Sequence, residues 1–529
     1  FQIWESYYRS PRSGATMDRG WCVNKNSDPI TDFDNQSTNR STRVLFITQS
    51  SAYPQLGVLY LVDALRQAGI ESLVVSCDLP AENLDSILTD YRPAVVGMSV
   101  LTAPQVVDFK RHSIRIKNEY PEISIVWGGV HPTILSEECM DSSYIDFVFI
   151  GQGEDVFPDL VLDIVNGTNK FTKRVQGRSP QTLDRYSPAW DKVSLSQYLF
   201  SERHSVRSPI TKVQTSAAKV FDQIKSDIQA IDPGLSSDVS IHVLEDIKKW
   251  DVGLYELDKS IFYYLITSRG CPYSCTFCSE PLQIMHGNAA GKFTWNSHDL
   301  DWVKCQIDVI RERLARDGED LEGVGIWDDM FWVDKKRARN ILSYLASEGL
   351  TYLIEARPDQ LIRDDYSLYN FLGETNCSQV FIGAESASQE TLDYIKKHTD
   401  IEDYYRLMKH ASIVKVPLRM SFIVGFPGET DESVNKTLDF CETVTNGAYG
   451  PWVNISGPKI FTPYPGTVEY DRAVEAGFVK PATHVDWRKI HRSTEAYLEC
   501  FPWMRNYPSA TLERLEHYFG QGYSALTTH

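Results

Sequence analysis

Three cysteines within eight residues form the group in this 529-residue sequence whose spacing is best suited to chemistry. Cys271, Cys275 and Cys278 follow directly after an apolar run that predicts a strand. Three thiolates at this spacing can bind three irons of a [4Fe–4S] cube and leave one iron open, whereas a closed site has four thiolates. An open metal position is what chemistry requires. The alternatives are a structural zinc completed by a distant fourth cysteine, or three cysteines that are close by chance.

The elements that must position these cysteines alternate between strand and helix from Phe262 onward. Repeated strand–helix units favour an open or partial (β/α)6 barrel, with functional groups at the strand ends. The expected strands are 262–268, 323–327, 352–355, 380–383, 419–425 and 453–460, and the expected helices include 302–316, 335–348 and 431–445.

A similar alternation begins at Arg43 and predicts a doubly wound parallel sheet of the flavodoxin-like type. Ligands of such sheets bind at the carboxyl ends of the strands, where small residues let a bulky ligand approach the backbone. Small residues at the expected strand ends are Ser99, Gly128, Gly129, Gly151 and Gly153. The expected strands are 44–47, 72–75, 94–98, 123–127 and 144–150, with helices at 56–68 and near 84–91.

The chain is therefore expected to be an α/β protein of several parts. They are a polar N-terminal extension (1–42), the doubly wound domain (43–188), a linker or insertion with helical content (189–260), the barrel (261–479) and a helical C-terminal cap (480–529). The aromatic residues of the cap could line a substrate pocket or belong to ordinary core: Trp487, Tyr497, Trp503 and Tyr507.

Composition narrows the class of protein. A formal net charge of −18 argues against nucleic acid as a partner, because phosphate binding needs a basic face. No apolar run reaches the ~18 residues that a membrane span requires. The segment from Phe1 to Thr42 lacks the apolar core of a signal peptide, and without an initiator Met the numbering is expected to begin inside the natural chain. A clustered-cysteine metal site in such a chain predicts a reducing, cytoplasmic location.

The cysteine spacing and the strand ends that follow it resemble the radical SAM superfamily. Its CxxxCxxC motif matches Cys271, Cys275 and Cys278, and five later segments are similar to its strand ends in the right order: 327–331, 355–359, 383–386, 422–430 and 461–467. The resemblance implies a [4Fe–4S] cluster whose open iron binds S-adenosylmethionine, which is cleaved to a 5′-deoxyadenosyl radical.

The same resemblance implies five contacts to S-adenosylmethionine. Glu385 and Arg357 would hold its charged end, since a carboxylate suits an ammonium and a guanidinium suits a carboxylate. Asp329 would serve the amino group or the ribose, and Phe277 and Ile423 would lie near the adenine. The alternatives are ion pairs that brace the barrel mouth and, for the two apolar residues, plain core.

The first domain resembles the cobalamin-binding domain that precedes many radical SAM cores. The residues implied as cobalamin contacts are Tyr53, Leu56, Gly57, Ser99, Leu101, Gly128, Gly129, His131, Gly151, Gly153 and Glu154. The sequence departs from the DxHxxG loop that supplies a histidine to cobalt, because the loop from Gln49 to Gly57 contains neither Asp nor His. Cobalamin is therefore expected with its own base displaced and no histidine on cobalt, and His131 is expected to be a hydrogen-bonding contact.

Together the two resemblances imply a cobalamin-dependent radical SAM methyltransferase that acts on an unactivated carbon or phosphorus centre of a peptide or small molecule. A flavodoxin or ferredoxin would supply electrons. Two alternatives stay open: a cyclase or rearrangement enzyme of the same architecture that does not methylate, and a cobalamin-binding sensor. A sensor has no need of an open iron, which counts against the second.

Overall fold

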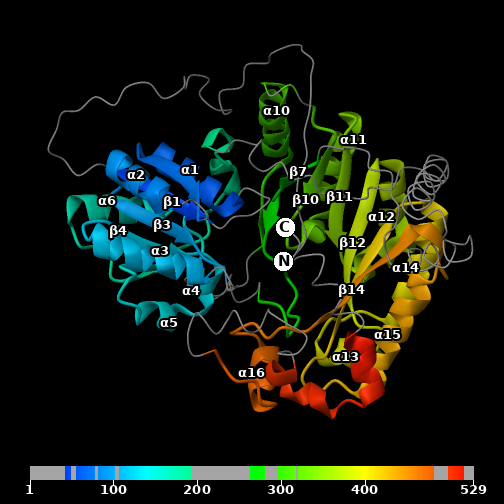
Figure 1. The fold of residues 1–529 in the computed structure, drawn as a ribbon. Helices are drawn as coiled ribbons and strands as arrows, with labels where there is room; N and C mark the ends of the chain where they lie inside the picture. The colour runs from blue at the N-terminus through cyan, green and yellow to red at the C-terminus, as the bar shows by residue number, and fades with distance from the viewer. Residues whose placement is uncertain are drawn as a thin grey trace, which may run out of the picture.

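Two parallel sheets of six strands each form the framework of the chain and lie side by side (Figure 1). The computed structural model describes residues 42–48, 55–77, 81–101, 106–192, 262–279, 295–316, 318, 320–481 and 498–516. The expected extension 1–42 and linker 189–260 lie almost wholly outside the described residues.

The N-terminal sheet has the strand order β2-β1-β3-β4-β5-β6. This is the flavodoxin-like doubly wound order, so the predicted fold class is confirmed. The strands are β1 Arg43–Thr48, β2 Glu71–Ser76, β3 Val95–Ser99, β4 Ser124–Gly128, β5 Phe147–Ile150 and β6 Arg174–Gln176. The sixth strand was not predicted, because its three residues are too few to show a pattern.

Helices cover both faces of this sheet, as the alternation of side chains along the strands requires. In β1, Val44 and Phe46 pack with α1 and α6, whereas Leu45 and Ile47 pack with α2, α3 and α5. A strand buried on both faces reads as a continuous apolar run, which is why the sequence revealed it. The helices are α1 Leu56–Gln67, α2 Ala81–Tyr91, α3 Val106–Glu119, α4 Val130–Ile134, α5 Ser136–Met140 and α6 Phe157–Asn166.

The second sheet has the order β14-β13-β12-β11-β10-β7, so each strand pairs in parallel with the next in the chain. This is the expected partial barrel. Its strands are β7 Phe262–Leu265, β10 Gly323–Ile326, β11 Thr351–Ala356, β12 Cys377–Glu385, β13 Leu418–Val424 and β14 Val453–Ile460. A separate two-stranded antiparallel ribbon consists of β8 Ser268–Arg269 and β9 Asn296–Ser297.

Three of the barrel helices match the expected ranges closely: α10 Leu300–Arg316, α11 Lys335–Ser347 and α15 Asp431–Thr445. The others are α12 Pro358–Glu374, α13 Gln389–Tyr394, α14 Ile401–Val414 and α16 Val468–Glu475. Among the described residues, no helix combines the length and apolar character that a membrane crossing needs.

The C-terminal segment 498–516 packs under the barrel beside α13 and α16 (Figure 1). Trp503 and Tyr507 are buried there, and they donate hydrogen bonds to the backbone oxygens of Gly425 and Glu429 at 2.9 and 3.2 Å. These two aromatic residues therefore belong to the core. Trp487 and Tyr497 lie outside the described residues.

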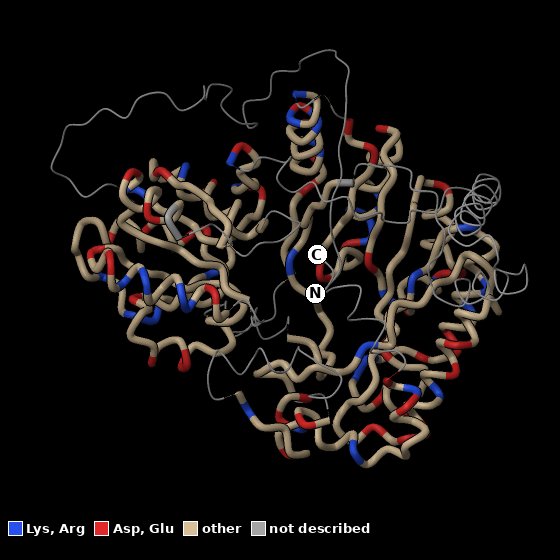
Figure 2. The backbone as a smooth tube through the Cα atoms, viewed as in Figure 1, with Lys and Arg blue, Asp and Glu red and all other residues tan. Residues whose placement is uncertain are grey.

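Acidic and basic residues are intermixed along the described parts of both domains (Figure 2). Most ion pairs are exposed, and such pairs contribute little to stability. Three largely buried pairs concern the candidate site: Arg269 with Glu154, Arg357 with Asp359, and Lys397 with Glu385.

Candidate cofactor-binding site

The cluster cysteines lie on the loop that follows β8, and neighbouring elements hold this loop at its centre. The Thr276 amide donates to the Ile395 oxygen at 3.0 Å, and the Thr276 oxygen accepts from the Glu469 amide at 3.2 Å. The Thr276 hydroxyl also donates to the Glu469 carboxylate at 2.6 Å. All three cysteines are half-buried.

The donors that this loop supplies are three thiols. Among the described residues, no three Cys, His, Asp or Glu side chains converge as ligands of one metal ion. Thiolates are the ligands that iron–sulfur clusters take, and each binds a different iron of a [4Fe–4S] cube. The thiols of Cys271, Cys275 and Cys278 are therefore chemically suited to three irons of such a cluster.

Arg357 follows β11 and reaches the cluster loop. One terminal nitrogen lies 4.0 Å from the Cys275 sulfur, and the guanidinium carbon lies 3.8 Å from the centre of the Tyr273 ring. Its Nε donates to the Asp359 carboxylate at 2.9 Å, and another nitrogen donates to the Lys397 backbone oxygen. The side chain is buried among these contacts.

Glu385 ends β12 and is paired with a lysine from the segment after α13. Lys397 Nζ donates to Glu385 Oε1 at 2.7 Å, and both side chains are buried. Lys397 Nζ also lies 5.9 Å from the centre of the Phe277 ring, beside the last cluster cysteine. Lys397 is thus the residue that Glu385, Arg357 and Phe277 have in common: Glu385 and Phe277 through its ammonium group and Arg357 through its backbone oxygen.

The backbone at Glu385 is shaped for this arrangement. Glu385 has a φ of +67°, which is rare for a residue with a side chain, and the register between β12 and β13 shifts here. Such conformations persist where the surroundings impose them and are common at functional sites. A Cβ at Gly383 would lie 2.4 Å from Glu385 Oε1, so this glycine leaves room for the carboxylate.

The remaining expected contacts to S-adenosylmethionine divide into two kinds. Asp329 is exposed, and its Oδ2 accepts from the amide of Gly270 at 2.9 Å, directly before Cys271. Phe277 and Ile423 are partly buried against the same apolar cluster, in which Phe277 lies 5.7 Å from the Phe426 ring.

The expected cobalamin contacts gather at one edge of the N-terminal sheet. Leu56 and Gly57 begin α1, and the others follow the ends of β3, β4 and β5. Hydrogen bonds join these ends: the Val100 amide donates to the Gly128 oxygen at 2.8 Å, and the Gly151 amide donates to the Thr133 hydroxyl at 3.0 Å. Tyr53 lies outside the described residues.

Gly129 and His131 show how closely this edge is packed. Gly129 has a φ of +93°, and a Cβ there would lie 3.0 Å from the Val100 backbone. The His131 ring is fully buried beside Trp127, with ring centres 6.4 Å apart. Gly57, in contrast, is exposed, and a Cβ there would meet no described atom within 4 Å.

Sequence reasoning missed three charged residues of the site. Lys397 follows a helix end, where no periodicity marks a buried position. Asp328 lies within the predicted strand-end segment 327–331 and Arg269 directly follows the predicted strand 262–268, and that placement was the available signal. The Asp328 carboxylate accepts from both the amide and the hydroxyl of Thr267, so it braces the strand that leads into the cluster loop.

Two family models match the chain, one in each of the two sheet regions. The family model of the B12 binding domain matches residues 42–161, and that of the radical SAM superfamily matches residues 265–441. The chain is a B12-binding radical SAM protein. Its cofactors are accordingly cobalamin, S-adenosylmethionine and a [4Fe–4S] cluster.

Individual relatives extend the likeness of this B12-binding radical SAM protein over most of its length. An uncharacterized methyltransferase of Pyrococcus horikoshii is 25% identical over 441 residues, which are 82% of this chain and 81% of the relative. An anaerobic magnesium-protoporphyrin IX monomethyl ester cyclase of Rubrivivax gelatinosus is 23% identical over 419 residues, which are 76% of this chain and 65% of the relative. The protein is thus homologous to a methyltransferase and to a cyclase.

A solved structure shares the fold. TsrM, a radical S-adenosylmethionine methyltransferase of Kitasatospora setae solved with tryptophan substrate and a SAM analogue, superposes with a TM-score of 0.55 and 17% identity. The likeness covers 90% of this chain and 89% of TsrM. Another structure of TsrM contains cobalamin and a [4Fe–4S] cluster.

Proposed function

We propose that this protein methylates an unactivated carbon or phosphorus centre of a peptide or small-molecule substrate. The observation that carries the proposal is that Glu154 of the expected cobalamin edge pairs with Arg269 of β8, the strand that leads directly into the cluster loop. When bound, the cofactors supply a methyl group on cobalamin and a 5′-deoxyadenosyl radical. The homology to a methyltransferase supports the same activity.

The residues at the barrel mouth would bind and orient S-adenosylmethionine. Glu385 would accept from its ammonium group while it holds Lys397, since a carboxylate has about four acceptor positions. Arg357 would donate to its carboxylate, and Phe277 and Ile423 would pack on the adenine. Asp329 is the next candidate for the amino group or the ribose.

The edge formed by the ends of β3, β4 and β5 would hold cobalamin in its base-off form. Glycines at 128, 129, 151 and 153 let the ligand approach the backbone there. His131 would contribute by hydrogen bonding and not as a ligand to cobalt, in keeping with its buried position against Trp127. We place the enzyme in the cytoplasm, with a flavodoxin or ferredoxin as electron donor.

The test is anaerobic turnover of the reconstituted enzyme with deuteromethyl-labelled S-adenosylmethionine, read by mass spectrometry. We expect deuteromethylcobalamin to form, followed by transfer of the label to candidate substrates. Formation of 5′-deoxyadenosine without any labelled cobalamin would contradict methylation. That result would favour the non-methylating alternative, which the homology to a cyclase supports.

A further inference from the structure

The four residues that precede the first cluster cysteine, 267–270, are held by hydrogen bonds to two acidic residues of the barrel domain. Asp328 accepts hydrogen bonds from Thr267 and Ser268, and Asp329 accepts from the amide of Gly270. Both acidic residues follow β10 of the same domain. Arg269 lies between these anchored positions, and because successive side chains of a strand point to opposite faces, it points away from Asp328.

Arg269 reaches the cobalamin-binding domain. Its Nη1 donates to Glu154 Oε1 at 2.7 Å and to Gln152 Oε1 at 3.0 Å, and its guanidinium carbon lies 4.6 Å from the centre of the Tyr60 ring. Gln152 and Glu154 belong to the loop after β5, and Tyr60 belongs to α1. One arginine, two positions before Cys271, therefore contacts two elements of the cobalamin-binding edge.

The ion pair is well shielded from solvent, with side-chain exposures of 19% for Arg269 and 5% for Glu154. An exposed pair would be screened and weak, but a buried pair that loses one partner leaves an uncompensated charge.

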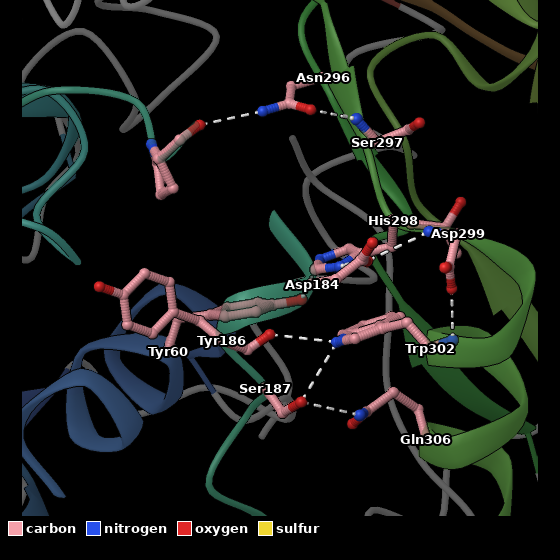
Figure 3. Close-up of polar contacts among 12 residues, drawn as sticks. Tyr60, Asp184, Tyr186, Ser187, Asn296, Ser297, His298, Asp299, Trp302 and Gln306 are labelled. Carbon is pink, nitrogen blue, oxygen red and sulfur yellow. Dashed lines mark hydrogen bonds and ion pairs between the residues drawn. The ribbon is translucent and has the colours of Figure 1, made fainter. Parts of the chain in front are cut away.

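A second contact ties the partner strand of the same ribbon to the same helix. His298 directly follows β9, which pairs with β8 through Asn296 and Arg269. Its Nδ1 lies 2.9 Å from Asp184 Oδ1, and its Nε2 lies 3.2 Å from the hydroxyl of Tyr60 (Figure 3). The ribbon β8–β9 thus docks on the cobalamin-binding domain through both of its strands.

We propose that Arg269 is a positioning residue that sets the distance between the cluster and cobalamin by joining the cluster loop to the loop after β5. The proposal rests on the proposed function only in that both cofactors are bound. It assigns the Glu154 carboxylate to the arginine and leaves the neighbouring glycine backbone for the cofactor. The contact would matter to the enzyme through geometry, because misplacing reacting groups by about 1 Å can lower the rate roughly 100-fold.

The experiment measures the distance itself in the anaerobic holoenzyme. Magnetic coupling between cob(II)alamin and the reduced cluster is read by electron paramagnetic resonance in the parent, Arg269→Gln, Glu154→Gln and the double variant. The control is Arg174→Gln, which breaks an exposed pair with Glu137 on the same domain, with exposures of 46% and 82%. Iron and cobalamin contents are measured in parallel.

We expect both single variants to retain iron and cobalamin but to show a weaker and more widely distributed coupling. The double variant should show no additional change, because both substitutions remove the same contact. The control should match the parent. If Arg269→Gln loses iron, the magnetic coupling in Glu154→Gln tests the proposal, because that substitution leaves the cluster loop unaltered.

An unchanged coupling in Glu154→Gln would overturn the proposal. So would loss of cobalamin in Glu154→Gln with retention in Arg269→Gln, which would assign the carboxylate to the cofactor instead. The result does not depend on methylation: altered coupling in an enzyme that transfers no methyl group would leave this inference standing and defeat the proposed function.

Discussion

At the residue scale, the iron content of the protein tests the three cysteines of the cluster loop. Each of its cysteines is expected to bind a separate iron, so losing one should open the cube. Anaerobically reconstituted protein should contain about four irons per chain, and Cys275→Ala should lose nearly all of them. Cys441→Ala is the matched control, because this thiol is buried in the core on α15, far along the chain. Full iron content in Cys275→Ala would contradict the ligand assignment.

Glu385 carries the prediction for S-adenosylmethionine. Charge-assisted hydrogen bonds contribute about 1.5–3 kcal/mol each, so Glu385→Gln should weaken binding roughly ten- to a hundredfold. The substitution keeps the shape of the side chain and removes its charge. Cluster content should stay normal, and calorimetry on the anaerobic protein measures the affinity.

Arg357→Lys is the companion variant, because it keeps the charge but removes the planar guanidinium. Unchanged affinity in both Glu385→Gln and Arg357→Lys would mean that these residues only brace the barrel. Asp329→Asn would then be the variant to measure.

Glu429 gives a pH dependence of stability. Burial raises the pKa of its carboxyl group to about 7, although the amides of Gly425 and Phe426 donate to it. The folded protein therefore binds more protons than the unfolded chain above pH ~4.5, and this contribution to stability falls as the pH rises through 7. Between pH 5 and 8 the loss is roughly 2–3 kcal/mol.

Denaturant unfolding at pH 5 and pH 8 measures this effect. Glu429→Gln resembles the protonated side chain, so the variant should lose less stability than the parent between the two values. Glu432→Gln, at the exposed start of α15, should behave as the parent does. If Glu429→Gln loses as much stability as the parent between pH 5 and pH 8, burial does not raise the pKa of Glu429.

At the scale of elements, the barrel helices α11, α14, α15 and α16 begin with side-chain caps that accept a hydrogen bond from the first turn. Thr430 precedes α15, and its hydroxyl accepts from the Ser433 amide at 3.2 Å. This cap fixes where the helix begins, directly after the loop that follows β13. It therefore links the position of the helix to the ligand edge of the barrel.

Thr430→Ala should lower the free energy of unfolding by about 1 kcal/mol, because an amide of the first turn loses its acceptor. Thr443→Ala, near the exposed end of the same helix, is the control. Alanine is the better helix former there, so that change should be neutral or slightly stabilising. Equal destabilisation by Thr430→Ala and Thr443→Ala in denaturant unfolding would contradict a stabilising role of the Thr430 cap.

At the scale of the whole molecule, the two domains meet through side chains that are buried on both sides. Trp302 Nε1 donates to the Tyr186 oxygen at 3.1 Å, and Gln306 Nε2 donates to the Ser187 hydroxyl at 3.0 Å (Figure 3). Both donors lie on α10. The segment after β6 is thus joined to the barrel by polar contacts as well as by apolar packing.

His298 makes this junction sensitive to acid. Burial lowers the pKa of its ring to about 4, so the ring is neutral near pH 7. The Asp184 carboxylate can only accept, which places the proton on Nδ1 and leaves Nε2 to accept from the Tyr60 hydroxyl. Burial also raises the pKa of Tyr60, so its hydroxyl keeps the proton that it donates.

The unfolded chain binds the His298 proton below pH ~6.5 and the folded protein does not. This contribution to stability is therefore complete above pH ~6.5 and is lost as the pH falls toward 4, with roughly 2 kcal/mol lost between pH 7 and 5. His298→Asn cannot titrate and should flatten this part of the stability profile in denaturant unfolding. Tyr60→Phe keeps the ring and should retain the slope; a parental slope in His298→Asn would refute the assignment.

The sequence by itself determined the framework of both domains, because local patterns encode it. Strands buried on both faces are continuous apolar runs, and β14 Val453–Ile460 was predicted at the residues where it lies. α15 Asp431–Thr445 was likewise predicted over its full length, from its amphipathic spacing. The cysteine spacing likewise placed the cluster loop after the first strand of the barrel.

Only the tertiary structure decided which charges meet. Arg269 and Glu154 are 115 positions apart, and no local periodicity reports that a strand end of one domain will face a loop of the other. Lys397 reaches Glu385 because α13 turns the chain back over the strand end, and Gly383 leaves the space that the pair needs. Local spacing fixes the direction of a side chain on its own element, whereas the identity of its partner depends on how whole elements pack.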